Sequence, residues 1–80
     1  MKLANEKETI RRLVLLREHR GMTMRQLADA AGLHENTISN IEHGLKHPRI
    51  ETLAMLADAL GVDLGQLISE KTRIAALRAP

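Results

Sequence analysis

Residues 23–44 read TMRQLADAAGLHENTISNIEHG, and this segment decides the fold. Apolar residues recur in it at helical spacing and predict short helices over about 24–31 and 35–43. The residues expected to face inward are Leu27, Ala28, Ala31, Ile38 and Ile41. Gly32-Leu33-His34 leaves room for a tight turn between the two helices. Two short helices joined by a turn that contains glycine have helix-turn-helix geometry.

The sequence on either side predicts three more helices, over about 6–20, 50–60 and 64–69. Val14 and Leu15 are expected to widen the apolar stripe of the first of these. No window alternates apolar and polar residues with a period of two, so strands are not expected. The predicted class is all-α, a compact domain of five helices. The inward faces of the flanking helices are predicted to carry Ile10, Leu13, Leu16, Ile50, Leu53, Leu56, Ala57, Leu60, Leu64, Leu67 and Ile68.

Local signals mark the ends of these helices. Glycines stand where helices commonly end in a left-handed residue, at Gly21, Gly32, Gly44 and Gly61. Three pairs have capping-box spacing, in which each residue's side chain accepts a hydrogen bond from the other's backbone N–H. These pairs are Asn5 with Glu8, Thr23 with Gln26, and Asp63 with Gln66.

The composition allows one domain and excludes several classes of protein. The chain has 80 residues, a formal net charge of +2, no Cys and no Phe, Tyr or Trp. A disulfide framework and thiol chemistry are therefore excluded, and so are aromatic platforms for single-stranded bases. No apolar run suits a membrane span or a secretory signal, so we expect a cytoplasmic protein without membrane contact. We expect an N-terminal arm at 1–4, the folded domain at 5–69, and a tail or dimer-contact extension at 70–80.

The outward face of the helix over 35–43 has side chains that can read DNA bases. An Asn side chain can pair with N6 and N7 of adenine, Glu can accept from N4 of cytosine, and Thr offers a methyl to thymine. A helix also fits the major groove. A polar outer face is equally typical of any surface helix, so this pattern alone leaves both interpretations open. The residues on this face are Glu35, Asn36, Thr37, Ser39, Asn40 and His43.

A series of short motifs runs through residues 8–69 in unbroken register. The motifs are Leu16-Arg17, Gly21-Met22-Thr23, Leu27-Ala28, Ala31-Gly32-Leu33, Thr37-Ile38-Ser39, Ile41-Glu42-His43-Gly44, Pro48, Glu51-Thr52-Leu53, Leu56-Ala57 and Ala59-Leu60-Gly61-Val62. In this order and spacing they resemble the phage-repressor and Cro-like helix-turn-helix family, also called the XRE family. The resemblance implies a five-helix repressor-like fold whose second and third helices bind operator DNA, usually as a symmetric dimer.

The resemblance also implies roles for individual residues. Base readers in the family lie at the start and middle of the third helix, which here gives Glu35, Asn36 and Asn40, with His34 and Thr37 beside them. Met24 stands where the family often has a phosphate-binding Gln, so we expect that contact from a neighbouring residue. The expected phosphate contacts are Arg25, Gln26, His43, Lys46, His47 and Arg49, with Arg12 and Arg20 as further candidates.

Four other positions concern helix ends and charge. His34 stands where the family usually has Ser or Thr to cap the third helix, and this weaker cap costs up to about 1 kcal/mol. Arg49 stands where the family usually has Ser to cap the fourth helix, and it cannot cap in that way. Arg49 can reach DNA instead. Glu42 is expected to pair with Arg17, as the family pattern implies, rather than to contact DNA. Glu35 would repel phosphates but would select cytosine.

No metal site, cofactor or enzyme activity is expected. His43 and His47 are four residues apart, but Gly44 and Pro48 break the helix, so the two rings would not share a face. Ser39 and Ser69 are the only serines, and the family resemblance places Asp58 and Asp63 on the other side of the domain from the histidines, so no catalytic arrangement is expected.

Two functions remain open. The first is a homodimeric, sequence-specific regulator of transcription, expected to be a repressor on a palindromic operator with half-sites about ten base pairs apart. The second is an antitoxin-like or anti-repressor-like module that holds a protein partner. Leu67, Ile74 and Leu77 would close the dimer in the first case and stay exposed in the second.

Overall fold

The computed structural model describes residues 6–68, which form five helices in the predicted order. The helices are α1 (Glu6–His19), α2 (Met24–Ala31), α3 (Glu35–Glu42), α4 (Ile50–Leu60) and α5 (Leu64–Leu67). No strand occurs in this part of the chain, in agreement with the predicted all-α class. None of its helices is long and apolar enough to cross a membrane.

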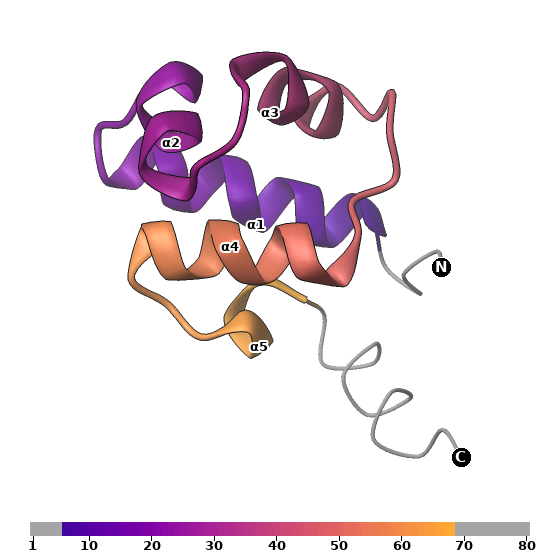
Figure 1. Cartoon of the computed structure of the whole chain (residues 1–80). Helices are drawn as coiled ribbons and strands as arrows, with labels where there is room; N and C mark the ends of the chain where they lie inside the picture. Colours follow the sequence, from indigo (N-terminus) through magenta and orange to yellow (C-terminus); the bar gives the residue numbers. More distant parts are fainter. Residues whose placement is uncertain (1–5, 69–80) are drawn as a thin grey trace.

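The helices enclose one core. α2 packs against α3 and α4, while α1 packs against α3 and α5, and α5 also packs against α4. Figure 1 shows α2 and α3 at one side of the domain and α5 at the other, beyond α4. Every helix contributes at least one fully buried aliphatic residue, and each such burial is worth about 1.5–3 kcal/mol. The largest of these residues are Leu13, Leu27, Ile38, Leu53, Leu56, Leu60 and Leu67.

The buried stripe of α1 is narrower than predicted. Leu15 is 54% exposed, so the expectation that it widens the stripe is wrong. α1 packs chiefly against α3 and α5, and Leu15 faces solvent instead. Thr9, four residues before the buried Leu13, is itself fully buried. Its hydroxyl has no hydrogen-bond partner in the described part of the chain.

The turn between α2 and α3 has the predicted helix-ending geometry. Gly32 is left-handed, with φ 72° and ψ 31°. Its N–H donates to the Asp29 carbonyl at 3.3 Å, and the Leu33 N–H donates to the Ala28 carbonyl at 2.8 Å. This is a Schellman motif, which satisfies carbonyls left over at the end of a helix. Gly21, Gly44 and Gly61 also have positive φ values.

The start of α2 is held by the predicted capping box. The Gln26 N–H donates to Thr23 Oγ1 at 3.0 Å, and the Thr23 N–H donates to Gln26 Oε1 at 2.8 Å. At the last helix, the Asp63 N–H donates to Gln66 Oε1 at 2.8 Å. Asn5, expected to cap α1, lies outside the described residues.

Leu67 is not available for the dimer contact predicted from the sequence. Its side chain has 0% exposure because α5 packs into the space beside α1 and α4. Leu67 therefore belongs to the core of a single chain, and that prediction is wrong. Ile74 and Leu77, the other two predicted dimer contacts, lie outside the described residues.

Candidate nucleic-acid interface

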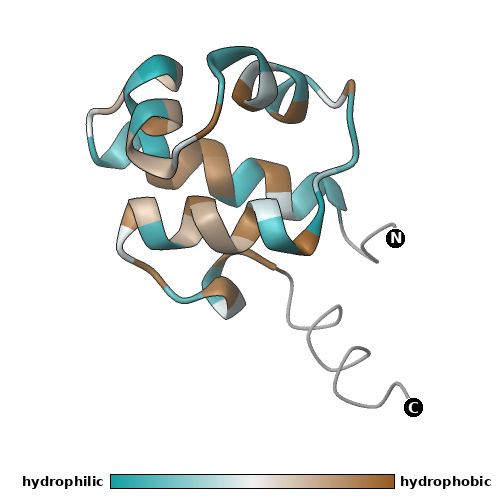
Figure 2. Ribbon diagram, in the orientation of Figure 1, coloured by the Kyte–Doolittle hydropathy of each residue, from teal (hydrophilic) through white to brown (hydrophobic). Residues whose placement is uncertain are grey.

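α3 presents a polar side to solvent because two isoleucines hold its other side in the core. Ile38 and Ile41 are buried. Figure 2 shows hydrophilic residues along the outer side of α3. All the residues predicted to read bases are exposed or half-buried, namely His34, Glu35, Asn36, Thr37 and Asn40. The structure thus leaves them accessible, and their contacts with bases stay a prediction.

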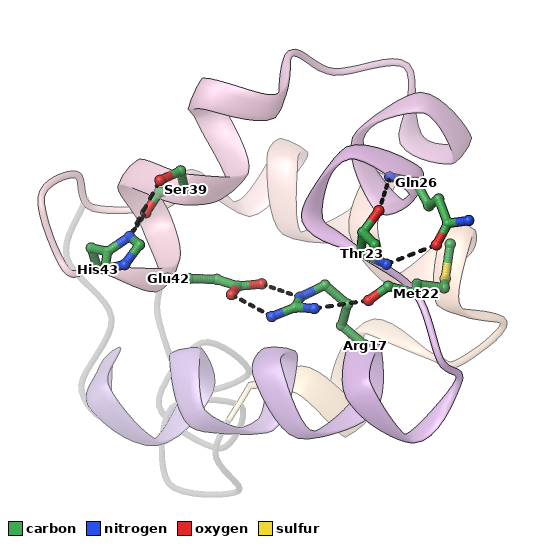
Figure 3. Close-up of polar contacts among 7 residues, drawn as sticks. All are labelled: Arg17, Met22, Thr23, Gln26, Ser39, Glu42 and His43. Carbon is green, nitrogen blue, oxygen red and sulfur yellow. Dashed lines mark hydrogen bonds and ion pairs between the residues drawn. The ribbon is translucent and has the colours of Figure 1, made fainter.

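Arg17 fixes the inner side of α3 to α1. Its Nε donates to Glu42 Oε2 at 2.7 Å and its Nη2 to Glu42 Oε1 at 2.9 Å, which confirms the predicted pair. Nη1 donates to the Met22 carbonyl at 2.8 Å, and Figure 3 shows the three contacts together. The hydrogen bond to Glu42 raises the pKa of Arg17, against a smaller lowering by burial. Because Glu42 is neutralised there, Glu35 is the acid that α3 presents outward.

Basic residues of the loop after α3 surround a shallow hollow. Lys46, His47 and Arg49 line it from the loop, so three of the predicted phosphate contacts come together. The remaining lining residues are uncharged: Thr37, Ile41, Leu45, Pro48 and Thr52. Arg49 makes no side-chain hydrogen bond to the start of α4, as expected from its poor capping chemistry. The amides at the start of α4 and these basic groups favour an anion.

Two further histidines flank α3. His34 precedes the helix and makes no side-chain capping bond, in agreement with its predicted weakness as a cap. His43 follows the helix, and its Nδ1 lies 2.7 Å from the Ser39 carbonyl oxygen and 3.3 Å from Ser39 Oγ (Figure 3). Nδ1 therefore donates to the carbonyl, which leaves Nε2 for contacts outside the domain.

The other predicted phosphate contacts lie at the start of α2. Arg25 and Gln26 are both exposed, in the first turn of the helix. The capping bond from Thr23 occupies Gln26 Oε1, so the amide nitrogen of Gln26 is the group left to donate (Figure 3). In Figure 1 α2 and the loop after α3 lie on opposite sides of α3. Phosphate contacts from α2 and from this loop would therefore lie on either side of α3.

Arg12 has partners that the sequence analysis did not anticipate. Nη2 donates to Glu8 Oε1 at 2.7 Å, and Nη1 donates to the Ile68 carbonyl at 2.8 Å. The guanidinium therefore joins α1 to the chain after α5, and the suggested phosphate contact of Arg12 stays a prediction. Arg20 is exposed and keeps its place as a candidate.

A second unpredicted contact reaches the loop itself. His47 Nδ1 lies 2.7 Å from Oε1 and 2.8 Å from Oε2 of Glu6, at the first turn of α1. The two residues are 41 positions apart, and no spacing rule links them. Within residues 6–68 no three His, Asp or Glu side chains form a group that could hold a metal ion.

The chain belongs to the helix-turn-helix family. The family model described as Helix-turn-helix (HTH_3) matches residues 13–67, from the middle of α1 to the end of α5. The chain is 33% identical over 63 residues to the immunity repressor protein of Bacillus phage phi105. The aligned region is 79% of this chain and 44% of that relative, so the chain spans less than half of the relative's length.

Solved structures agree on the fold. The chain resembles the clp gene regulator ClgR from Corynebacterium glutamicum with a TM-score of 0.75 and 27% identity, over 98% of this chain and 83% of that one. It also resembles a chain in the complex of SinR protein with SinI protein, with a TM-score of 0.71 and 29% identity. That match covers 81% of this chain and 64% of the other. The predicted helix-turn-helix fold is thus confirmed.

Proposed function

We propose that this protein binds double-stranded DNA with sequence specificity and represses transcription as a homodimer on a palindromic operator. One observation carries the proposal: the accessible polar side of α3 adjoins a hollow lined by three basic residues. Thr37 belongs to both, because it is a predicted base reader and also lines the hollow. Base reading and phosphate binding would therefore act on the same stretch of duplex.

In this arrangement α3 enters the major groove with its N-terminal half. Asn36 and Asn40 pair with purine edges, most favourably adenine, and Glu35 accepts from cytosine. Lys46 and Arg49 hold the phosphates on one side, while Arg25 holds them on the other. These contacts fix the register in which the bases are read.

The homodimer and the palindrome follow from the small surface of one domain. Two α3 helices related by a twofold axis would reach successive major grooves about 34 Å apart. Repression is proposed because the chain is similar to a phage immunity repressor. A dimer on such a site acts by occupying DNA that polymerase would use, which requires neither enzyme activity nor a cofactor. A cytoplasmic location remains an expectation from the sequence.

Selection from a pool of random duplexes, followed by affinity measurements, tests this proposal. A palindromic consensus with half-sites about ten base pairs apart is expected. Asn36→Ala should bind the selected site more weakly, while Asp58→Ala, an exposed change near the far end of α4, should bind as the wild type does. Sedimentation of the protein with the selected duplex gives the number of subunits bound. Failure to enrich any sequence would refute the proposal.

The second candidate is a domain that holds a protein partner. The observation in its favour is that large apolar residues are exposed on three segments: Leu15, Leu45 and Met55. One of the similar chains was solved in a complex of SinR protein with SinI protein. Under this alternative the isolated chain would select no DNA sequence and would remain a monomer in solution, with those residues uncovered.

A further inference from the structure

Helix α1 touches the basic loop through Glu6 and His47. The carboxylate side chain of Glu6 is 11% exposed, whereas the imidazole of His47 is 67% exposed. Both Glu6 oxygens lie within hydrogen-bond distance of the same nitrogen, Nδ1 of His47. Glu6 is thus enclosed at the start of α1 while most of the His47 ring faces solvent beside Lys46 and Arg49.

This contact decides which nitrogen of His47 carries a proton. An ionised carboxylate only accepts hydrogen bonds, so Nδ1 has to be the donor. The outer nitrogen, Nε2, then presents a lone pair in the neutral ring and an N–H in the imidazolium. A neutral His47 in this pose would turn a lone pair toward a phosphate. The imidazolium would donate to Glu6 and to the phosphate at the same time.

The charged groups around His47 come from two segments. α1 contributes the negative charge of Glu6, and the loop contributes the positive charges of Lys46 and Arg49 in the same hollow. The residues with which α3 and α4 line that hollow are uncharged: Thr37, Ile41 and Thr52. Glu6 therefore places one negative charge against the ring, beside the positive charges of Lys46 and Arg49.

We propose that Glu6 is a positioning residue for DNA binding, which holds His47 so that its phosphate contact requires the uptake of a proton. The inference rests on the proposed function, because it assigns a mode of regulation to the same interface. It makes α1, which lies outside the helix-turn-helix, part of that interface. Binding to DNA is consequently tighter in mildly acidic solution, where histidines gain a proton.

The first test measures affinity for a fluorescein-labelled duplex of mixed sequence, about 20 base pairs long, at constant ionic strength. The wild type should bind roughly three- to tenfold more tightly at about pH 6 than at about pH 8, because each subunit gains one solvent-exposed contact with a phosphate. The slope of the logarithm of the binding constant against the logarithm of the salt concentration should also steepen at the lower pH. The change should be about 0.9 per subunit, since each subunit gains one phosphate contact.

Two variants and one control test whether this pH dependence of binding comes from His47 and Glu6. His47→Gln should lose the part of it that depends on the contact with Glu6. Glu6→Gln should also respond less, because the Gln amide can donate to Nδ1 and the neutral ring can then carry its proton on Nε2. His19→Gln, an exposed change at the opposite end of α1, should keep the full response. Thermal melts verify that each variant is folded.

Nitrogen NMR of the free protein gives a readout that needs no DNA. At about pH 8 the neutral ring of His47 should carry its proton on Nδ1 in the wild type and shift toward Nε2 in Glu6→Gln. A neutral wild-type ring protonated on Nε2 would overturn the inference, and so would an undiminished pH response in His47→Gln. Neither result would contradict the proposed function. If the wild type bound no duplex at either pH, the proposed function itself would fail.

Discussion

Arg17 and Glu42 join α1 to α3 through two parallel hydrogen bonds of 2.7 and 2.9 Å, with side-chain exposures of 13% and 7%. The same guanidinium bonds to the Met22 carbonyl in the turn that leads to α2. One side chain therefore sets the position of both helices of the helix-turn-helix against α1. Because the pair lies on the inner side of α3, it orients the proposed reading helix without contacting DNA.

Glu42→Ala should lower the free energy of unfolding by about 3 kcal/mol, because it leaves the guanidinium of Arg17 enclosed without its carboxylate. Arg17→Lys should cost about half as much, since an ammonium keeps the charge but cannot form the paired contact. Urea unfolding followed by circular dichroism measures both. A loss below about 1 kcal/mol in Glu42→Ala would place this pair with ordinary surface ion pairs.

The contribution of Arg17 to stability should not vary with pH across the neutral range. The pKa of Arg17 is raised above a value that is already high, chiefly by the hydrogen bond to Glu42. A group whose pKa is higher in the folded chain than in the unfolded chain stabilises the fold at every pH below its unfolded pKa. This stabilisation is lost only as the pH rises through the folded pKa. The difference in unfolding free energy between the wild type and Arg17→Lys should therefore be equal at about pH 6 and about pH 9. A difference that shrinks at the higher pH would contradict this.

Thr9→Val should stabilise the domain by about 1 kcal/mol. Thr9 is fully buried and its hydroxyl has no partner within residues 6–68, while valine has nearly the same shape without the polar group. Thr9→Ala is the comparison, because it also removes the methyl and leaves a small void. Thermal unfolding of the three proteins should rank Val above the wild type and the wild type above Ala. Destabilisation by valine would mean that the hydroxyl has a partner after all.

Gly32→Ala should destabilise the domain by about 1 kcal/mol through the backbone alone. The residue has a φ of 72°, and a β-carbon added there would meet no atom within 4 Å, so no clash contributes. Gly32→Asn should cost less, because asparagine tolerates the left-handed conformation better. Chemical unfolding of the two variants tests this order. Equal losses would point to a cause other than the backbone angle.

Local signals explain why most of the fold was predictable. The Thr23–Gln26 box and the left-handed Gly32 act within a few residues, so the sequence predicted their geometry directly. The width of a buried stripe depends instead on which neighbours pack against it. Periodicity alone therefore placed Leu15 inward, and it gave no reason to expect that Thr9 would be buried.

Some features of the candidate site could also be predicted from the sequence, and others could not. The accessible side of α3 followed from helical spacing once Ile38 and Ile41 were placed in the core. The pair of Arg17 with Glu42 came from the family resemblance, since nothing in the spacing of two residues 25 positions apart requires it. Neither helical spacing nor the family resemblance predicted the contact of Glu6 with His47. It depends on how the start of α1 lies against a loop that follows α3, which only the assembled fold determines.

Lys46→Ala and Asn36→Ala should weaken DNA binding in different ways. Loss of Lys46 removes a phosphate contact, so affinity should fall about equally for the selected site and for unrelated duplexes, and the salt slope should decrease by about 1. Loss of Asn36 should cost about 1–3 kcal/mol on the selected site and less on unrelated DNA, with the salt slope unchanged. Fluorescence anisotropy titrations at several salt concentrations measure both quantities. If Asn36→Ala weakened all duplexes equally, Asn36 would be a positioning contact and the specificity would have to come from Glu35 or Asn40.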